Sequence, residues 1–223
     1  MRRLVDIYRN RIHNLDELIA FDKDNHVPST FFFGMSNGKY LNYSIKQAEY
    51  WINMVRAAGL SVGVHGICYD NKSVMQKEYD TLKSITGLDQ FGIRMHYLRT
   101  TRDTFDYIEE CGYAFDSSHL MMEQPYKKRQ MWEFPLHIMD VNMFRNGRPW
   151  TNRTFDQVKK LSISLLEQAE QKRISHFNVL LHDGLFSPSF CAVQCWYKWF
   201  IQYMKENRYE SVNYMDSIEQ LER

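Results

Sequence analysis

The sequence has little excess charge and no long apolar run. Its 223 residues include 28 Lys or Arg and 27 Asp or Glu, for a formal charge of +1. This balance argues against a dedicated nucleic-acid binder, which needs a basic face to displace counterions. No apolar stretch approaches the roughly 18 residues of a membrane-spanning helix, and none follows the charged start Met1–Arg3 as in a secretory signal. We therefore expect a cytoplasmic globular protein with no membrane span.

Several common catalytic motifs are missing. No Gly-x-Gly-x-x-Gly follows an expected strand, which argues against a dinucleotide site. Neither Gly-x-Ser-x-Gly nor His-Glu-x-x-His occurs, so a serine hydrolase of the nucleophile-elbow type is not indicated. No Cys-x-x-Cys occurs among the four cysteines, which we interpret as reduced thiols. A nucleophilic Cys68 near His65 is an alternative for an unrelated α/β enzyme.

What the sequence does contain is alternation between strand-like and helix-like segments. Short β-rich runs occupy 29–33, 61–65, 91–96, 113–116, 134–141 and 176–182. Capping-box pairs between them begin at positions 14, 44, 73 and 154, and Gly59, Gly87 and Gly112 stand where helices would end. Continuous apolar strands alternating with helices predict a parallel sheet in one α/β domain over 1–223. A (β/α) barrel or a doubly wound sheet would fit.

Polar residues stand where these expected strands end. They are His65, Arg94, His96, Asp116, Asp140 and His182. Because active sites of parallel α/β folds lie at the carboxyl ends of the strands, the pattern predicts a shared site there. His and Asp side chains suit a divalent metal, or a His acid with an Asp that orients it. Glu133 precedes Phe134-Pro135, and we interpret it as an edge position outside the site.

Six segments, in order, resemble motifs of the polysaccharide deacetylases, the NodB-homology group similar to carbohydrate esterase family 4, in a divergent bacterial subgroup. They are Ser-Thr-Phe-Phe-Phe at 29–33, Val-Gly-Val-His at 62–65, Gly-Ile-Arg-Met-His-Tyr-Leu at 92–98, Gly-Tyr-Ala-Phe-Asp-Ser-Ser at 112–118, Phe-Pro-Leu-His-Ile-Met-Asp at 134–140 and Leu-Leu-His at 180–182. The resemblance covers roughly residues 14–205. It implies a distorted (β/α)7 barrel and the metal-dependent removal of N-acetyl or O-acetyl groups from a carbohydrate.

The resemblance also implies roles for individual residues. His182 matches the general acid, Asp140 the residue that orients it, and Arg94 the motif Arg, and we expect these three to be catalytic. His65 matches the first ligand of a divalent metal, which we expect to be zinc. Tyr69 stands where the second His ligand belongs, and the adjacent Asp70 is the substitute we predict.

The first family motif, a paired Asp at the end of strand one, has no clear match. Asp6 lies near the expected distance before Ser29, but residues 1–13 are more typical of a helix, with Leu4, Ile7 and Tyr8 on one face. The first strand is therefore expected to be missing or altered. A sheet without it would expose an edge through which two copies could associate.

Two functions from different classes fit this pattern. One is a polysaccharide deacetylase, active or impaired, with His96, Tyr97 and Trp132 binding the sugar, since flat rings can stack on pyranose faces. The other is a catalytically inactive carbohydrate-binding or scaffold domain of the same fold. The missing second His favours the inactive protein, whereas the retained His65, Arg94, Asp140 and His182 favour the enzyme.

Overall fold

The computed structural model describes residues 14–38, 41, 43–145 and 152–223. Asp6 and the helix expected over 1–13 lie outside this part of the chain. The described residues divide into two compact units, each considered by itself below. Unit 1 takes the residues up to Val27 and Leu136–Ser211, and unit 2 takes Pro28–Pro135 and Val212–Arg223. The single domain expected over 1–223 stays a prediction.

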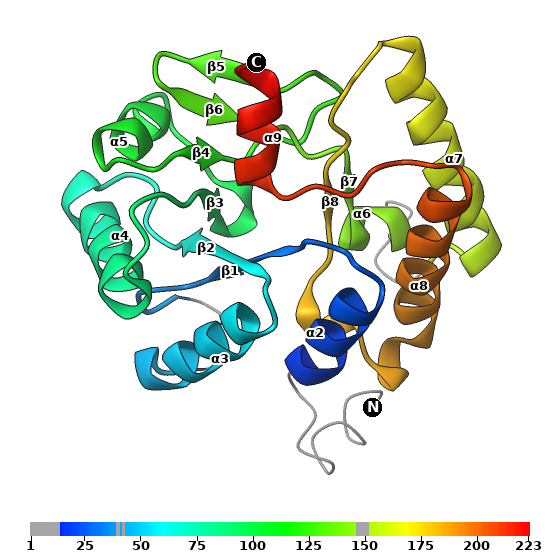
Figure 1. Cartoon of the computed structure of the whole chain (residues 1–223), viewed down its shortest axis with the longest axis horizontal. Coiled ribbons are helices and arrows are strands. Elements are labelled where there is room, and N and C mark those ends of the chain that lie inside the picture. Colours follow the sequence, from blue (N-terminus) through cyan, green and yellow to red (C-terminus); the bar gives the residue numbers. More distant parts are fainter. Residues whose placement is uncertain (1–13, 39–40, 42, 146–151) are drawn as a thin grey trace. The chain divides into compact units, whose positions relative to one another are not determined.

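Unit 2 contains a six-stranded sheet in which all neighbours but one pair run parallel (Figure 1). The strands, in spatial order, are β1 (Thr30–Phe33), β2 (Ser61–Gly66), β3 (Ile93–Met95), β4 (Phe115–Asp116), β6 (Met131–Glu133) and the antiparallel β5 (Tyr126–Lys128). The register pairs His65 with Arg94 and Asp116 with Glu133. The polar residues that end these strands therefore meet at one edge of the sheet.

The helices of unit 2 have clear signals in the sequence. They are α3 (Ile45–Ala57), α4 (Lys72–Thr86), α5 (Thr104–Glu110) and α9 (Tyr214–Leu221), with a 3-10 turn, η1, at His96–Leu98. Ser44 and Gln47 form the expected capping box of α3, and Gly87 ends α4 with a φ of 67°. Both α3 and α4 pack on β2. Helix α9 adds Ile218 to a core cluster with Phe115 and Phe134, so the C-terminal segment is part of this unit.

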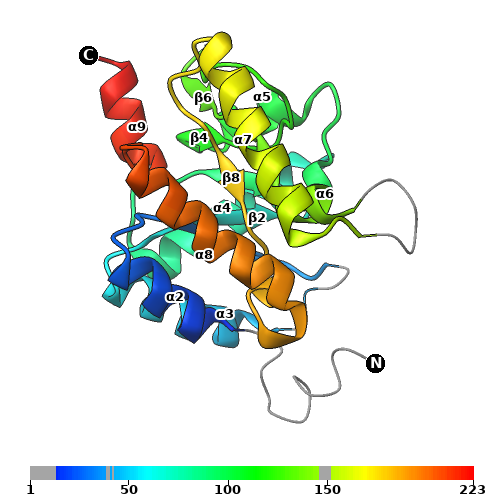
Figure 2. The same ribbon diagram turned by 90° about the vertical axis from the view of Figure 1, so that its right-hand side faces the viewer.

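Unit 1 contains a parallel pair of strands. It also has its own helices (Figure 2). Its elements are α2 (Leu15–Asp24), β7 (Ile138–Met139), α6 (Asp140–Phe144), α7 (Phe155–Gln171), β8 (Val179–Leu180), η2 (Asp183–Leu185), η3 (Pro188–Phe190) and α8 (Cys191–Glu206). The fully buried Trp196 of α8 donates its indole N–H to Ser162 Oγ of α7 at 2.9 Å. Tyr197 donates to Asp22 of α2, also at 2.9 Å. These buried bonds fix α8 against both neighbouring helices.

The mixed α/β fold with a parallel sheet is confirmed, and each expected strand segment contains a strand. In the described residues the strands form two sheets rather than one closed barrel. The antiparallel hairpin of β5 and β6 was not expected. The hairpin corrects the interpretation of Glu133 as an edge position. Glu133 is 1% exposed and belongs to β6, which lies between β4 and β5 in the sheet.

Two further expectations concern the surface. Among the described helices, none combines the length and the apolar character needed to cross a bilayer. Strand β1 is the first strand of the six-stranded sheet, with β2 as its neighbour in that sheet. Association of two copies through a sheet edge stays a prediction.

Candidate functional site

The predicted catalytic pair of His182 and Asp140 lies in unit 1, at the ends of the paired strands β8 and β7. Asp140 is fully buried and its Oδ1 lies 2.7 Å from His182 Nδ1. Backbone amides of Val141 and His182 also donate to this carboxylate, each at 2.6 Å. Because a carboxylate only accepts, Nδ1 carries the proton and Nε2 is the nitrogen that takes or gives one. The His182 side chain is 49% exposed, so a buried carboxylate orients an accessible imidazole.

The predicted metal and sugar residues lie in unit 2, after β2 and β3. His65 Nε2 is 2.9 Å from His96 Nδ1, and the two rings meet edge to face with centroids 5.0 Å apart. Tyr97, the next residue in the chain, has a left-handed backbone and is 57% exposed. The structure therefore brings together one predicted metal ligand and two predicted sugar contacts.

The second predicted metal ligand does not join this group. Asp70 is exposed, and its Oδ1 accepts a hydrogen bond from Cys68 Sγ at 3.6 Å. In the part of the chain that the structure describes, no three His, Cys, Asp or Glu side chains are placed to hold a metal ion. Zinc sites normally use three or four protein ligands. The described residues thus do not fit a zinc ion by themselves, and zinc stays a prediction on which no step below depends.

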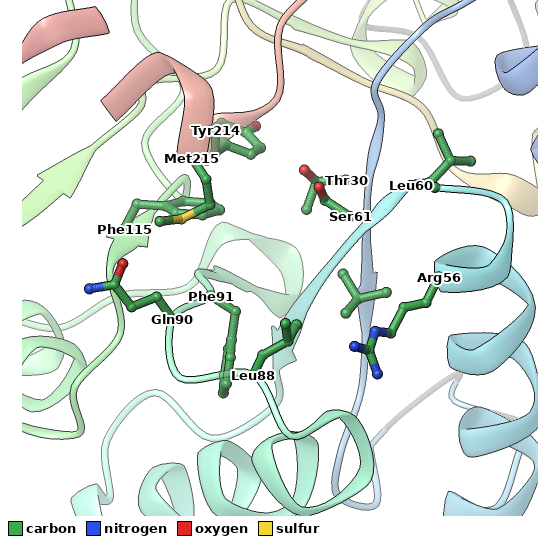
Figure 3. Close-up of a pocket in the computed structure, with 12 residues that line it drawn as sticks. Thr30, Arg56, Leu60, Ser61, Leu88, Gln90, Phe91, Phe115, Tyr214 and Met215 are labelled. Atoms are coloured by element: carbon green, nitrogen blue, oxygen red, sulfur yellow. The ribbon is translucent and has the colours of Figure 1, made fainter. Parts of the chain in front are cut away.

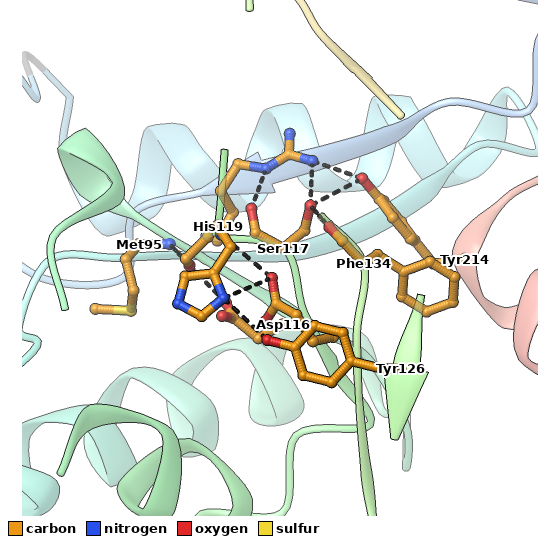
Figure 4. Close-up of polar contacts among 10 residues, drawn as sticks. Met95, Asp116, Ser117, His119, Tyr126, Phe134 and Tyr214 are labelled. Atoms are coloured by element: carbon orange, nitrogen blue, oxygen red, sulfur yellow. Dashed lines mark hydrogen bonds and ion pairs between the residues drawn. The ribbon is translucent and has the colours of Figure 1, made fainter. Parts of the chain in front are cut away.

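Arg94 is buried inside unit 2, with 7% of its surface exposed. Figure 4 labels Ser117 and Tyr214, which accept hydrogen bonds from Arg94. Its Nε donates to the Ser117 carbonyl at 3.1 Å, and its Nη2 donates to Ser117 Oγ at 3.0 Å and to Tyr214 OH at 2.5 Å. The guanidinium also lies over the Phe32 ring, 4.4 Å from its centroid. These contacts join β1, β3, the end of β4 and α9. The catalytic role expected for Arg94 stays a prediction.

Trp132 packs beside the C-terminal helix. Its indole N–H donates to Glu222 Oε1 at 3.2 Å, and its ring packs against the core cluster of Phe115, Phe134 and Ile218. Lys127 Nζ lies 5.7 Å from the ring centroid. The structure thus gives Trp132 structural contacts, and its sugar-binding role stays a prediction.

Asp116 and Glu133 form a buried carboxyl pair that no pattern in the sequence indicated. Figure 4 shows Asp116 among its polar neighbours. The register of β4 and β6 pairs the two residues, and no N–H or O–H group of the described residues donates to Asp116 Oδ2 or to Glu133 Oε2. A proton on one carboxyl would serve both atoms, because a protonated carboxyl donates and a carboxylate accepts. Burial raises the pKa of both, that of Glu133 to about 10, and the charge of Asp116 adds to the rise at Glu133. Ser118 Oγ donates to Asp116 at 2.6 Å, and the His119 amide donates to Glu133 at 3.2 Å.

A further buried carboxyl, Glu78 of α4, lies near the ends of β1 and β2. It is fully buried, accepts from the hydroxyl of Ser36, and accepts from the Ile67 amide at 3.2 Å. Burial raises the pKa of Glu78. Its helical position gave no signal in the sequence.

A cavity of about 300 Å³ lies at the opposite end of the strands of unit 2 (Figure 3). Thr30 and Ser61, which begin β1 and β2, line it together with Tyr214 and Met215 of α9. Ligands of parallel α/β folds bind at the carboxyl ends of the strands. The position of this cavity, at the amino-terminal ends, therefore does not mark it as the candidate site.

Solved structures with a similar fold include proteins assigned as polysaccharide deacetylases and an allantoinase. The chain is similar to a protein assigned as a polysaccharide deacetylase of Mycobacterium smegmatis, with a TM-score of 0.66 and 16% identity over 84% of this chain and 70% of that one. It is also similar to a probable polysaccharide deacetylase of Pseudomonas aeruginosa PAO1, with a TM-score of 0.65 and 18% identity over 87% of this chain and 67% of that one. The Puue allantoinase has a TM-score of 0.69 and 18% identity over 92% of this chain and 70% of that one.

No family model and no curated protein matches the sequence. At 16 to 18% identity the structural likeness shows the fold, and it confirms the fold that the six sequence segments predicted. The chain therefore has a deacetylase-like α/β fold of NodB type.

Proposed function

We propose that this protein hydrolyses an acetyl group, on nitrogen or oxygen, of a carbohydrate. The observation that supports the proposal most is the buried Asp140 carboxylate that fixes the accessible His182 imidazole through Nδ1. The deacetylases of similar fold support the substrate class.

The geometry suits one proton-transfer role. Nε2 of His182 takes a proton from the attacking water and gives one to the departing amine or alcohol oxygen, which leaves acetate as the second product. Asp140 holds the ring in the tautomer that makes Nε2 the reacting nitrogen, and it stabilises the imidazolium that forms after the first transfer.

The test is acetate release from tetra-N-acetylchitotetraose and from its O-acetylated form. The wild-type protein releases acetate, and His182→Gln lowers the rate by about a hundredfold or more, the usual contribution of a general acid or base. His176→Gln, a histidine of the same unit outside the pair, leaves the rate unchanged. An active His182→Gln variant would remove this histidine from the mechanism.

A second candidate is a carbohydrate-binding protein without catalysis. It is favoured by Tyr69 in place of the second His and by the absence of a metal-ligand cluster among the described residues. Wild-type protein that binds the same oligosaccharides and releases no acetate from either would support this function over hydrolysis.

A further inference from the structure

The turn η1, which follows β3, has a strained backbone at Tyr97 and Leu98. Tyr97 and Leu98 have φ values of 59° and 53°, so two consecutive residues other than glycine lie in the left-handed region. Each such residue costs of order 1 kcal/mol and persists only where its surroundings hold it, often at a binding site. Here the turn sets the exposed Tyr97 ring 4.2 Å, between centroids, from the His96 ring. A flat aromatic surface is thus fixed beside the His65 and His96 pair.

Arg99 lies against this surface. Its guanidinium carbon is 4.8 Å from the centroid of the Tyr69 ring and 5.7 Å from that of the Tyr97 ring. Its Nε also donates to the His96 carbonyl at 3.3 Å. Cation–π contacts with two rings and one hydrogen bond thus restrict a side chain that is otherwise exposed.

The charge of Arg99 has no acidic counterpart in the part of the chain that the structure describes. Asp70, the acid next to Tyr69 in sequence, contacts Cys68 instead. Arginine presents a planar fork of donors that matches a carboxylate, and an arginine already held in place loses less entropy when it binds one. A pre-positioned guanidinium beside an exposed ring suits a ligand with both a pyranose face and a negative charge.

We propose that Arg99, with Tyr69 and Tyr97, forms an anion-binding corner in unit 2, which selects carbohydrates with an acidic residue such as a hexuronate. Tyr97 stacks on the sugar ring, and Arg99 binds the carboxylate. The inference rests on the proposed action on carbohydrate. It also gives a role to Tyr69, which places its ring under Arg99 at the position where the resembled family has a metal ligand.

The test compares two tetrasaccharides that both contain N-acetylated sugars. A hyaluronan tetrasaccharide carries carboxylates, and tetra-N-acetylchitotetraose is neutral. The wild-type protein binds the acidic one about tenfold more tightly at low salt, as expected for a charge-assisted contact, and the preference shrinks as salt screens the charge. Arg99→Gln reduces the preference to about twofold and retains the binding of the neutral sugar. Arg102→Gln, an exposed arginine nearby, keeps the wild-type preference.

The outcomes separate this inference from the function it rests on. Equal binding of the two sugars by the wild-type protein, or a preference that survives in Arg99→Gln, overturns the anion-binding corner and leaves the action on carbohydrate standing. Binding of neither sugar contradicts the proposed function itself, and the corner with it. Tyr97→Ala separates the two contacts, because it weakens the binding of both sugars.

Discussion

Replacement of Glu133 by Gln is expected to stabilise the protein at neutral and alkaline pH. The pKa of Glu133 in the folded chain is raised to about 10 from an ordinary value of 4.5, first by burial and then by Asp116. Between these two values the folded protein keeps a proton that the unfolded chain releases. The stabilisation from the protonated carboxyl is fully present below the unfolded pKa and is lost as the pH rises toward the folded pKa. Because the folded state retains this one proton, the free energy of unfolding falls by about 1.4 kcal/mol for each unit that the pH rises in this window.

Glutamine has the shape of a protonated glutamic acid and does not titrate. Its amide can donate to Asp116 as a protonated Glu133 can, and it does so without the pH-dependent cost. We expect Glu133→Gln to exceed the wild-type protein by about 3 to 5 kcal/mol near pH 8 and to differ by about 1 kcal/mol or less near pH 5.

The measurement is urea unfolding of both proteins across this pH range. Glu49→Gln, an exposed glutamate of α3, serves as the matched control and follows the wild-type curve. A wild-type stability that stays flat between pH 5 and pH 8, about three pH units, would show that Glu133 holds no such proton. A Gln variant that is less stable at every pH would show that the pair needs the carboxyl itself.

The same residues show where the sequence could and could not predict the fold. Strand β6 (Met-Trp-Glu) and strand β5 (Tyr-Lys-Lys) have three residues each, which is too short for a periodic pattern. They owe their structure to pairing with each other and with β4. The partner of Glu133 lies 17 positions earlier in the chain, at Asp116, and only the register of β4 and β6 joins them. Local patterns do not contain that register.

Local signals succeeded where local physics decides. The capping boxes predicted at Ser44 and Thr154 are formed, because their partners are three residues away. The box predicted at Ser73 is displaced, since Asn71 caps α4 by accepting from the Val74 amide. At Asn14 no side-chain cap is formed.

The candidate site shows the same division. Asp140 and His182 were paired in the prediction because both matched family motifs at strand ends, and they are in contact. The contact between His65 and His96 could not be predicted, because it depends on how neighbouring strands are aligned and on side-chain rotamers. Arg94 was assigned to catalysis from its motif, whereas its described contacts are those of a buried anchor.

Replacement of Arg94 by Met is therefore expected to lower the stability of unit 2. Methionine fills a similar length of the space over Phe32, but it cannot donate the three hydrogen bonds to Ser117 and Tyr214. Loss of hydrogen bonds from a charged donor, with their acceptors left buried, costs about 3 kcal/mol or more. Because one of these bonds ties Tyr214 to β3, amide exchange in α9 (Tyr214–Leu221) should also become faster.

Tyr214→Phe is the matched control, since it removes only the hydroxyl that Arg94 contacts. It should lower the free energy of unfolding by about 1 kcal/mol and change exchange in α9 less than Arg94→Met does. Thermal unfolding and hydrogen exchange of the three proteins measure both effects. If Arg94 serves catalysis alone, Arg94→Met would unfold like the wild-type protein and release no acetate. A folded but loosened Arg94→Met variant would instead assign the motif arginine to holding β1, β3, the end of β4 and α9 together, which is the role its contacts favour.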